Sequence, residues 1–310
     1  MIRYKPKFSF GTKAETLERL KPLLLHSQIP DILFFDLADW EVNFEHLLQK
    51  IRTYFADTHV IVRSSAHGED GDLTTMAGAH DSIPDVHVDN INLLHKSIKK
   101  VISSYERFNN ARSQLDQVLI QRMINNISTS GVVFTQDMNT GAPYYVINYD
   151  DHSGRTDTVT SSHSNELKTF YLSKESHLEP DHKLSTLIIL LRELEDIFET
   201  NILDVEFAIN QSGELYLFQV RPLHLKFDHD VSHKNHQEAL SQISSKFALL
   251  SQPHPYLYGS KTVFGIMPDW NPAEIIGIRP RPLSLSLYKE LITDNIWAYQ
   301  RDNYGYKNLR

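Results

Sequence analysis

Apolar residues recur at helical spacing in several stretches of the chain, and short apolar runs lie between them. Spacings of three and four residues predict helices behind Thr12, through Phe44–Phe55, Ile91–Ile102 and Leu184–Phe198, and later through Ala239–Phe247 and about 284–300. Apolar runs with β-branched residues predict strands at 32–36, 59–65, 118–123, 131–135 and 144–148. Residues 150–166 are polar and predict a loop. We therefore expect an α+β (α/β) protein with a mainly helical C-terminal extension.

One predicted hairpin, residues 204–221, carries polar groups at positions where strands usually bury apolar ones. Strand side chains repeat every two residues, so Asp204 and Glu206 share a face, as do Gln219 and Arg221 on the return strand. The Asn-Gln-Ser-Gly segment at 210–213 supplies the turn. Pairing Ile209 with Glu214 would set Asp204 opposite Gln219 and would bring all four polar groups to one surface.

Two carboxylates, an amide and a guanidinium together indicate a site that binds a metal ion and a phosphate group. Mg²⁺ prefers oxygen ligands from one or two carboxylates plus substrate phosphates, and an arginine can hold a phosphate with two parallel hydrogen bonds. The alternative is an ordinary hairpin with a solvated face. The hairpin alone favours neither.

Two cations earlier in the chain occupy positions suited to anions. Lys13 lies in the first turn of a helix that Thr12 and Glu15 begin with a capping-box pattern, where unsatisfied N–H groups and the helix dipole favour negative charge. Arg63 ends an apolar strand, with Ser64 beside it, before a polar loop containing Gly68 and Gly71. The alternatives are a solvated lysine and a strand-end arginine paired with a surface carboxylate.

Composition narrows the possible classes of protein. The 310 residues carry a net charge of −8, are 41% hydrophobic and contain no cysteine, which excludes disulfides, thiolate metal sites and cysteine nucleophiles. No apolar run is long enough for a membrane span, so we expect a cytoplasmic protein without a membrane partner. The acidic balance and the lack of a basic stripe argue against nucleic acid as a partner. A cluster of histidines at 224–236 favours a solvated hinge over a metal site.

Read in order, these segments resemble the N-terminal ATP-binding domain of phosphoenolpyruvate synthase and pyruvate phosphate dikinase, which has a two-lobed ATP-grasp fold. The resemblance covers about residues 8–225. It rests on Gly11–Leu17, Val62–Ala66 with Glu69-Asp70, Ala77-Gly78, Gln121–Met123, Ser130–Thr135, Asp137 with Thr140-Gly141, Asp204–Phe207 and Gln219–Pro222. Ordered agreement over so many segments is far more specific than one short motif.

The resemblance implies a role for each candidate residue. Lys13 and Arg63, with Ser64, would contact the triphosphate of ATP. Glu206 and Gln219 would hold Mg²⁺, and Asp204 and Arg221 would complete the metal and phosphate end. Gln121 to Met123 would line the adenine slot. Arg63, Arg221 and Asp204 would thus be the catalytic group.

The resemblance also implies a reaction. ATP would phosphorylate a histidine on a carrier domain, in the same longer protein or in another chain, and the phosphoryl group would pass to pyruvate or another small molecule. We expect an N-terminal lobe at 1–110, a second lobe at 111–225 and a helical extension at 226–310. The extension is weakly similar to the segment that follows the ATP domain in some phosphotransferases of this group.

The sequence departs from the family at two points. No Gly-rich Thr-Ser-His-Ala segment, the family's phospho-histidine site, follows the ATP domain, and Asp151–Thr156 replaces a Gly-Leu-Gly-Glu loop. Two alternatives therefore remain: a catalytically idle nucleotide-binding regulatory module, and an ATP-grasp ligase that activates a carboxylate.

Overall fold

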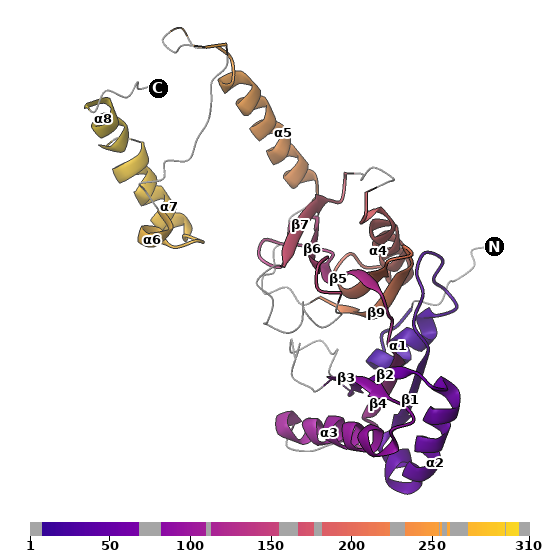
Figure 1. Cartoon of the computed structure of the whole chain (residues 1–310). Helices are drawn as coiled ribbons and strands as arrows, with labels where there is room; N and C mark the ends of the chain where they lie inside the picture. The colour runs from indigo at the N-terminus through magenta and orange to yellow at the C-terminus, as the bar shows by residue number, and fades with distance from the viewer. Residues whose placement is uncertain are drawn as a thin grey trace, which may run out of the picture. The chain divides into compact units, whose positions relative to one another are not determined.

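The computed structural model consists of two compact units, Met1–Glu238 and Ala239–Arg310. It describes residues 8–67, 82–109, 113–154, 167–176, 182–223, 233–253, 255, 259–260, 272–294 and 296–303. Figure 1 shows the elements of each unit. Among the described residues no helix combines the length and the apolar character that crossing a bilayer requires.

The first sheet has four antiparallel strands in the order β1-β4-β2-β3. They are β1 (Ile32–Asp36), β2 (His59–Ser65), β3 (Ser82–His87) and β4 (Gln117–Arg122). Helices α2 (Leu37–Phe55) and α3 (Ile91–Asn109) pack on one face. Because β4 lies inside this sheet, the division between the sheets falls after β4 and not at residue 110.

Alternation along β2 separates an apolar face from a polar one. Val60 and Val62 are fully buried in the core beneath α2 and α3. Successive side chains point to opposite faces of a sheet, so Arg63 and Ser65 lie on the face away from these helices. Gln121 of β4, which pairs with Ile61, lies on that same face.

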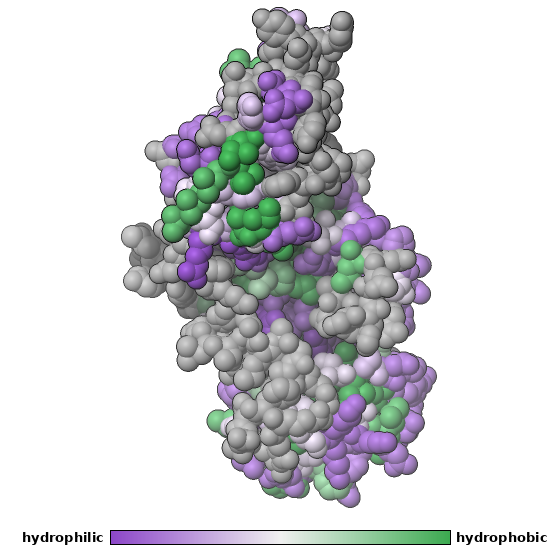
Figure 2. Space-filling view, turned by 90° about the vertical axis from the view of Figure 1, so that its left-hand side faces the viewer, coloured by the Kyte–Doolittle hydropathy of each residue, from purple (hydrophilic) through white to green (hydrophobic). Residues whose placement is uncertain are grey.

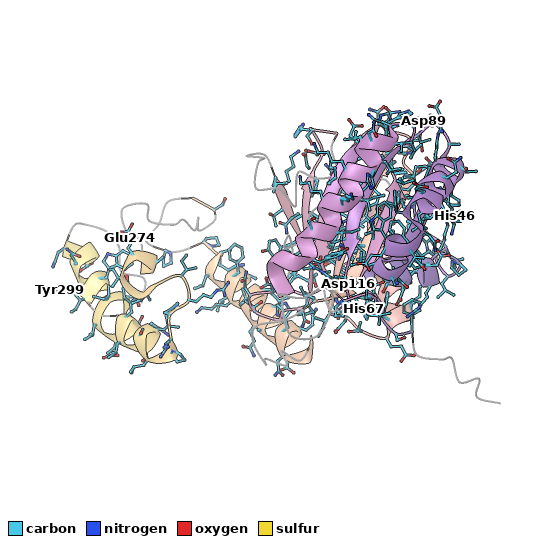
Figure 3. All side chains as sticks on the ribbon, turned by 90° about the horizontal axis from the view of Figure 1, so that it is seen from below. His46, His67, Asp89, Asp116, Glu274 and Tyr299 are labelled. Atoms are coloured by element: carbon cyan, nitrogen blue, oxygen red, sulfur yellow. The ribbon has the colours of Figure 1, made fainter. Side chains whose placement is uncertain are left out.

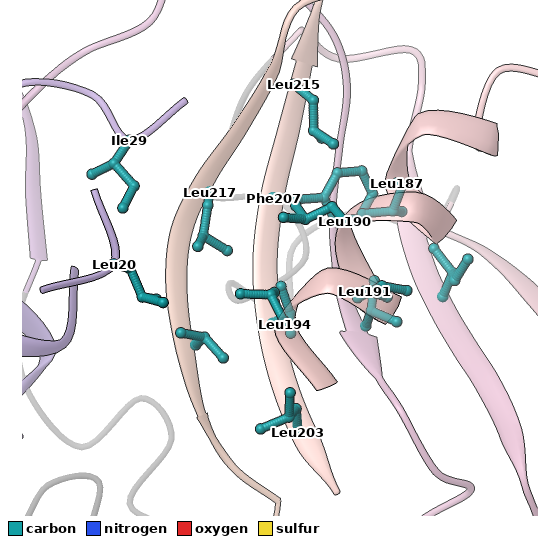
Figure 4. Packing of buried hydrophobic residues seen from close by; sticks show 14 of the residues in the cluster. Leu20, Ile29, Leu187, Leu190, Leu191, Leu194, Leu203, Phe207, Leu215 and Leu217 are labelled. Carbon is teal, nitrogen blue, oxygen red and sulfur yellow. The ribbon is translucent and has the colours of Figure 1, made fainter. Parts of the chain in front are cut away.

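The second sheet has five antiparallel strands in the order β7-β6-β5-β8-β9. They are β5 (Ile127–Phe134), β6 (Tyr144–Asp150), β7 (Lys168–Ser173), β8 (Leu203–Asn210) and β9 (Leu215–Pro222). Helix α4 (Ser185–Phe198) covers one face with its leucine stripe. Figure 4 shows Leu187, Leu190, Leu191 and Leu194 of α4 packed against Phe207 of β8 and Leu217 of β9.

Helix α1 (Lys13–Leu20) contacts strands of both sheets. The predicted capping box is present: the Thr12 side chain accepts a hydrogen bond from the Glu15 N–H, and the Glu15 carboxylate accepts one from the Thr12 N–H. Ala14, Leu17 and Leu20 are almost completely buried in the same core as β8 and β9. The helix ends at Leu20, before Pro22. The predicted apolar stripe therefore forms a short helix that packs against both sheets.

The register of the β8–β9 hairpin differs from the one expected from the sequence. Ile209 pairs with Leu215, and an irregularity at Phe218 shifts the ladder so that Glu206 faces Gln219 and Asp204 faces Arg221. Without this bulge, Gln219 and Arg221 would point to the same face as Leu215 and Leu217, which is the core beneath α4. A bulge with one extra residue re-aims the side chains that follow it. All four polar groups thus share the face opposite α4, as predicted, but the bulge places them there and the predicted register does not.

Other elements depart from the expectation. Strands β3 and β7 were not predicted, since β3 contains Pro84 and only one of its residues is buried, and β7 lies at the sheet edge. Most of the predicted 150–166 loop, the Gly68–Gly71 segment, Glu69-Asp70 and Ala77-Gly78 lie outside the described residues.

The C-terminal unit is helical, as expected, but several shorter helical segments replace the single helix predicted at about 284–300. It contains the end of α5 (His233–Leu250), then α6 (Pro272–Ile276), α7 (Pro282–Tyr288), a π-helical turn at Lys289–Thr293 and α8 (Ile296–Asn303). Several of its large apolar side chains are exposed, among them Ile278 and Leu283, and Figure 2 shows such hydrophobic patches in green.

Candidate functional site

Polar side chains of the first sheet hold the start of α1 in place. The Ser65 hydroxyl accepts a hydrogen bond from the Ala14 N–H at 3.0 Å, and the Thr12 hydroxyl donates to the Gln117 side-chain oxygen at 2.6 Å. The first turn therefore already satisfies two of its N–H groups, at Ala14 and Glu15, contrary to the expectation of free donors there. Lys13, in the same turn, is 6% exposed.

An ion pair crosses from the first sheet to the second. The Arg63 guanidinium on β2 donates from Nη2 to Oε2 of Glu206 on β8 at 2.6 Å, and from Nη1 to Oε1 of Gln121 at 3.5 Å. Arg63 and Glu206 are 11% and 22% exposed as side chains. Because the two residues are 143 positions apart in the chain, only the tertiary fold brings them together.

Two hydrogen-bond donors at this junction lack a partner. Arg63 Nε and Gln121 Nε2 are buried and have no hydrogen-bond partner among the described residues. Buried polar atoms are almost always paired, so such atoms call for a ligand or water that completes them. The two donors lie on adjoining side chains and favour an acceptor-rich, anionic ligand.

A second ion pair lies beside the first on the hairpin. Arg221 donates from Nε and Nη2 to Oδ2 of Asp204 at 2.8 and 2.7 Å. Gln219, 4% exposed, faces Glu206 across the ladder. The bulge at Phe218 therefore sets two carboxylates, an amide and two guanidiniums around one surface.

The surrounding cations determine the charge state of Glu206. Burial alone would raise the pKa of this carboxyl, but the positive charges of Arg63, Lys13 and Arg221 and the hydrogen bond from Arg63 outweigh it and hold the pKa below its ordinary value. An opposite charge within a few ångströms favours the ionised form. Glu206 is thus an anion held among three cations, and Lys13 belongs electrostatically to this group.

The donor set fits a hard divalent cation. Glu206 offers a carboxylate and Gln219 an amide oxygen from directly opposed positions, and Mg²⁺ takes such oxygens together with phosphate. Asp204 is less available to a metal than Glu206 and Gln219, since its Oδ2 already accepts two hydrogen bonds from Arg221. Its role as a metal ligand, like every other individual role assigned from the sequence, stays a prediction.

Two residues assigned to ATP from the sequence do not adjoin the Arg63–Glu206 pair. Ser64, 2% exposed, alternates to the opposite face of β2 from Arg63, and the hydroxyl that contacts α1 belongs to Ser65. Met123 follows β4 at the β3 side of the sheet, where its sulfur accepts a hydrogen bond from the Asp85 N–H at 3.0 Å. Gln121 lies beside Arg63, at the phosphate-binding candidates.

Sequence reasoning overlooked the residues that position this site. Gln117 joins α1 to β4, and the carboxylate of Asp116 accepts hydrogen bonds from the N–H groups of His67 and Ser113, both at 2.9 Å. Figure 3 shows Asp116 and His67 next to each other, where the chain leaves β2. The sequence signal that could have revealed them is the polar pair Asp116-Gln117 at the start of the buried strand β4.

The segment that departs from the family pattern begins with a compact ionic cluster. Asp151 pairs with Lys168 at 2.8 Å and with Lys183. Hydrogen bonds from Lys168 and Lys183 lower the pKa of Asp151 to about 2. This cluster fixes the end of β6 next to β7.

Comparison with known proteins finds a family match in the first half of the chain. Residues 11–156 match the family described as pyruvate phosphate dikinase, AMP/ATP-binding domain. The two antiparallel sheets agree with the ATP-grasp-like fold expected from that resemblance. No curated protein matches the chain.

Solved structures of distant relation also match. D-alanyl-alanine synthetase A from Vibrio cholerae is 14% identical over 75% of this chain and 63% of its own, with a TM-score of 0.40. D-alanine–D-alanine ligase from Helicobacter pylori is 12% identical over 74% of this chain and 57% of its own, with a TM-score of 0.37. The chain thus spans less than two thirds of the length of each.

Proposed function

We propose that this chain, whose residues 11–156 carry an AMP/ATP-binding domain of the pyruvate phosphate dikinase family, is an ATP- and Mg²⁺-dependent phosphotransferase module. It transfers a phosphoryl group from ATP to a histidine on a separate domain or chain. That histidine passes the group to a final acceptor, pyruvate or another small molecule. The observation that carries the proposal is the Arg63–Glu206 pair between the two sheets, together with the unpartnered donors Arg63 Nε and Gln121 Nε2.

The two ion pairs suggest how Mg-ATP is bound. Arg63 and Arg221 are each neutralised by a carboxylate. Mg-ATP carries both a cation and an anion, so Glu206 would hold the metal and Arg63 would contact phosphate oxygens. Charge stays balanced throughout, which avoids leaving a buried charge without a partner. Mg²⁺ supplies neutralisation of the phosphate charge.

The transfer itself needs positioning more than covalent help from the protein. The lone-pair nitrogen of a neutral histidine attacks the phosphorus, the new N–P bond forms, and the bridging P–O bond breaks with its electron pair leaving on the nucleotide. Negative charge grows on the leaving oxygen and is spread over the other phosphoryl oxygens. Arg63, Arg221 and Lys13 provide fixed positive charge where it develops.

Calorimetric titration with Mg-ATP tests the binding step. Arg63→Ala, Glu206→Gln and Arg221→Ala should each weaken binding strongly, whereas Arg52→Ala, a matched control with an exposed guanidinium paired to Asp89, should bind as the wild type does. Near-UV circular dichroism checks that each variant is folded. Wild-type affinity in all three site variants would refute the proposal.

The transfer step needs a second experiment. ATP labelled at the β- or γ-phosphate is incubated with the chain and an extract of the cells that contain it. We expect an acid-labile phosphoprotein that depends on the added chain, with AMP or ADP identifying the phosphoryl group that moves. Nucleotide binding without such a product supports the regulatory alternative, and ADP release that depends on a carboxylic acid supports the ligase alternative.

A further inference from the structure

A group of histidines and aspartates lies at the end of the first sheet where β2 begins and β3 ends, away from the Arg63–Glu206 pair. His59 begins β2 and pairs directly with His87 at the end of β3, and the ring centroids are 4.7 Å apart. Asp57 follows α2, and Asp89 precedes α3. Four segments of the chain therefore meet at this edge.

Three of these side chains are already close enough to share one ion. Asp57, His87 and Asp89 each offer a ligand atom, and the three atoms lie within 4.8 Å of one another; among the described parts of the chain this is the only such group. His87 Nε2 is 3.3 Å from the Asp57 carboxylate. Two ligands placed about 2.0–2.1 Å from a tetrahedral Zn²⁺ lie about 3.3–3.4 Å apart, so this pair already has the required spacing.

We propose that Asp57, His87 and Asp89, with His59 as the fourth ligand, bind a divalent transition-metal ion of the Zn²⁺ type. Imidazole nitrogens combined with carboxylates select this class of metal, because Mg²⁺ and Ca²⁺ take oxygen ligands instead. His59 is half exposed as a side chain, and its ring can turn toward the ion without disturbing the core.

The local charge favours a cation. Three carboxylates lie here: Asp57 and Asp89 are proposed ligands, and Asp85 lies 3.7 Å from His59 Nε2. The facing positive charge is Arg52, whose Nε donates to Asp89 Oδ1 at 2.6 Å. Asp89 can keep this hydrogen bond on one oxygen and bind the ion through the other.

Backbone conformation points to the same place. Ala56, Asp57 and Asp85 have φ values of 37°, 50° and 61°, and they are three of the five non-glycine residues with positive φ in the described chain. Such conformations persist where the surrounding structure imposes them. Two of the three carry carboxylates of this group.

Binding requires one local rearrangement. His87 Nδ1 accepts a 3.3 Å hydrogen bond from the Asp89 N–H, which leaves the ring proton on Nε2, facing Asp57. Coordination through Nε2 moves that proton to Nδ1 and breaks this long hydrogen bond. The ion then ties the end of α2 to β2, β3 and the start of α3, and so stiffens the sheet whose β2 strand carries Arg63.

The test is titration of the metal-stripped full chain with Zn²⁺ alone, in a non-chelating buffer with Mg²⁺ in excess to fill oxygen-only sites. We expect one site, with affinity reduced about tenfold or more in His87→Ala and in Asp57→Asn, since even indirect partners of a metal cost 10–100-fold when removed. His59→Ala should weaken binding less. Zn²⁺ should also raise the melting temperature of the wild type and not of His87→Ala.

His46→Ala is the matched control, since His46 is exposed on α2 (Figure 3) and joins no such group with the other residues that the structure describes. It should bind Zn²⁺ as the wild type does. Asp57→Asn keeps the test valid if His87→Ala fails to fold, because Asp57 is 88% exposed. Unchanged Zn²⁺ affinity in His87→Ala and Asp57→Asn, or an equal loss in His46→Ala, would overturn the proposal.

Discussion

Replacing Arg63 with methionine removes the positive charge of the cross-sheet pair while keeping much of the side chain's length. Glu206 then loses its 2.6 Å hydrogen bond and the Arg63 charge. It stays on a face where its side chain is 22% exposed. Lys13 and Arg221 remain nearby and compensate part of the charge.

The magnitude follows from the burial of the pair. Removing one partner of a fully buried pair costs roughly 3–5 kcal/mol, and partial exposure with two remaining cations reduces this to about 2–3 kcal/mol. That is a large share of the roughly 5–15 kcal/mol by which folded proteins are stable. The double variant Arg63→Met, Glu206→Gln should recover most of the loss, because no unpaired charge is left.

The effect must also depend on pH in a defined direction. In the wild type the pKa of Glu206 lies below the ordinary 4.5, so its carboxylate stabilises the fold above that pH, and the contribution is lost as pH falls through the lowered pKa. In Arg63→Met, burial acts with less opposition and the pKa rises. The difference between the two proteins is then greatest near neutral pH and narrows below about 4.5.

Urea unfolding at pH 7 and pH 4, followed by tryptophan fluorescence, to which the buried Trp40 contributes, measures both quantities. An equal m-value for the two proteins shows that the comparison is of the same transition. A loss below about 0.5 kcal/mol at pH 7, the range of ordinary surface substitutions, would refute the reasoning. So would a double variant whose loss is the sum of the two single losses.

Three further predictions concern other parts of the chain. Arg221→Lys should weaken Mg-ATP binding about ten- to hundredfold by calorimetry, because a hydrogen bond to a charged group contributes about 1.5–3 kcal/mol and lysine cannot make two in parallel; an unchanged affinity would contradict it. Gly131→Ala should destabilise by about 1–3 kcal/mol in urea, since its Cβ would lie 2.4 Å from a backbone oxygen of β6. Gly213→Ala meets no atom within 4 Å and should suffer only from its φ of 82°, so an equal or larger loss there would be contrary evidence. The Asp151 carboxyl should titrate near pH 2 by NMR and move toward 3.8 in Lys168→Met, whereas an ordinary midpoint in the wild type would show that the lysines do not bind it.

Local interactions account for what the sequence alone predicted well. The capping box at Thr12, the strands near 32–36 and 59–65, and the stripe of α4 depend on neighbours within a few positions, so pattern and propensity suffice. The ordered motifs also predicted the family resemblance, which the match over residues 11–156 confirms. Strands β3 and β7 were missed because edge strands bury few side chains and leave little alternation to detect.

The arrangement of the candidate site, by contrast, was decided by tertiary packing. Alternation alone places Gln219 and Arg221 on the same face as Leu215 and Leu217. The bulge at Phe218 is favoured because that face packs against the apolar side chains of α4, which would otherwise bury these two polar groups. The pairing of Arg63 with Glu206 likewise needs two sheets brought together by α1 and its contacts with Ser65 and Gln117. The sequence determined which charged residues are available. Burial of apolar surface between distant segments decided which of them meet.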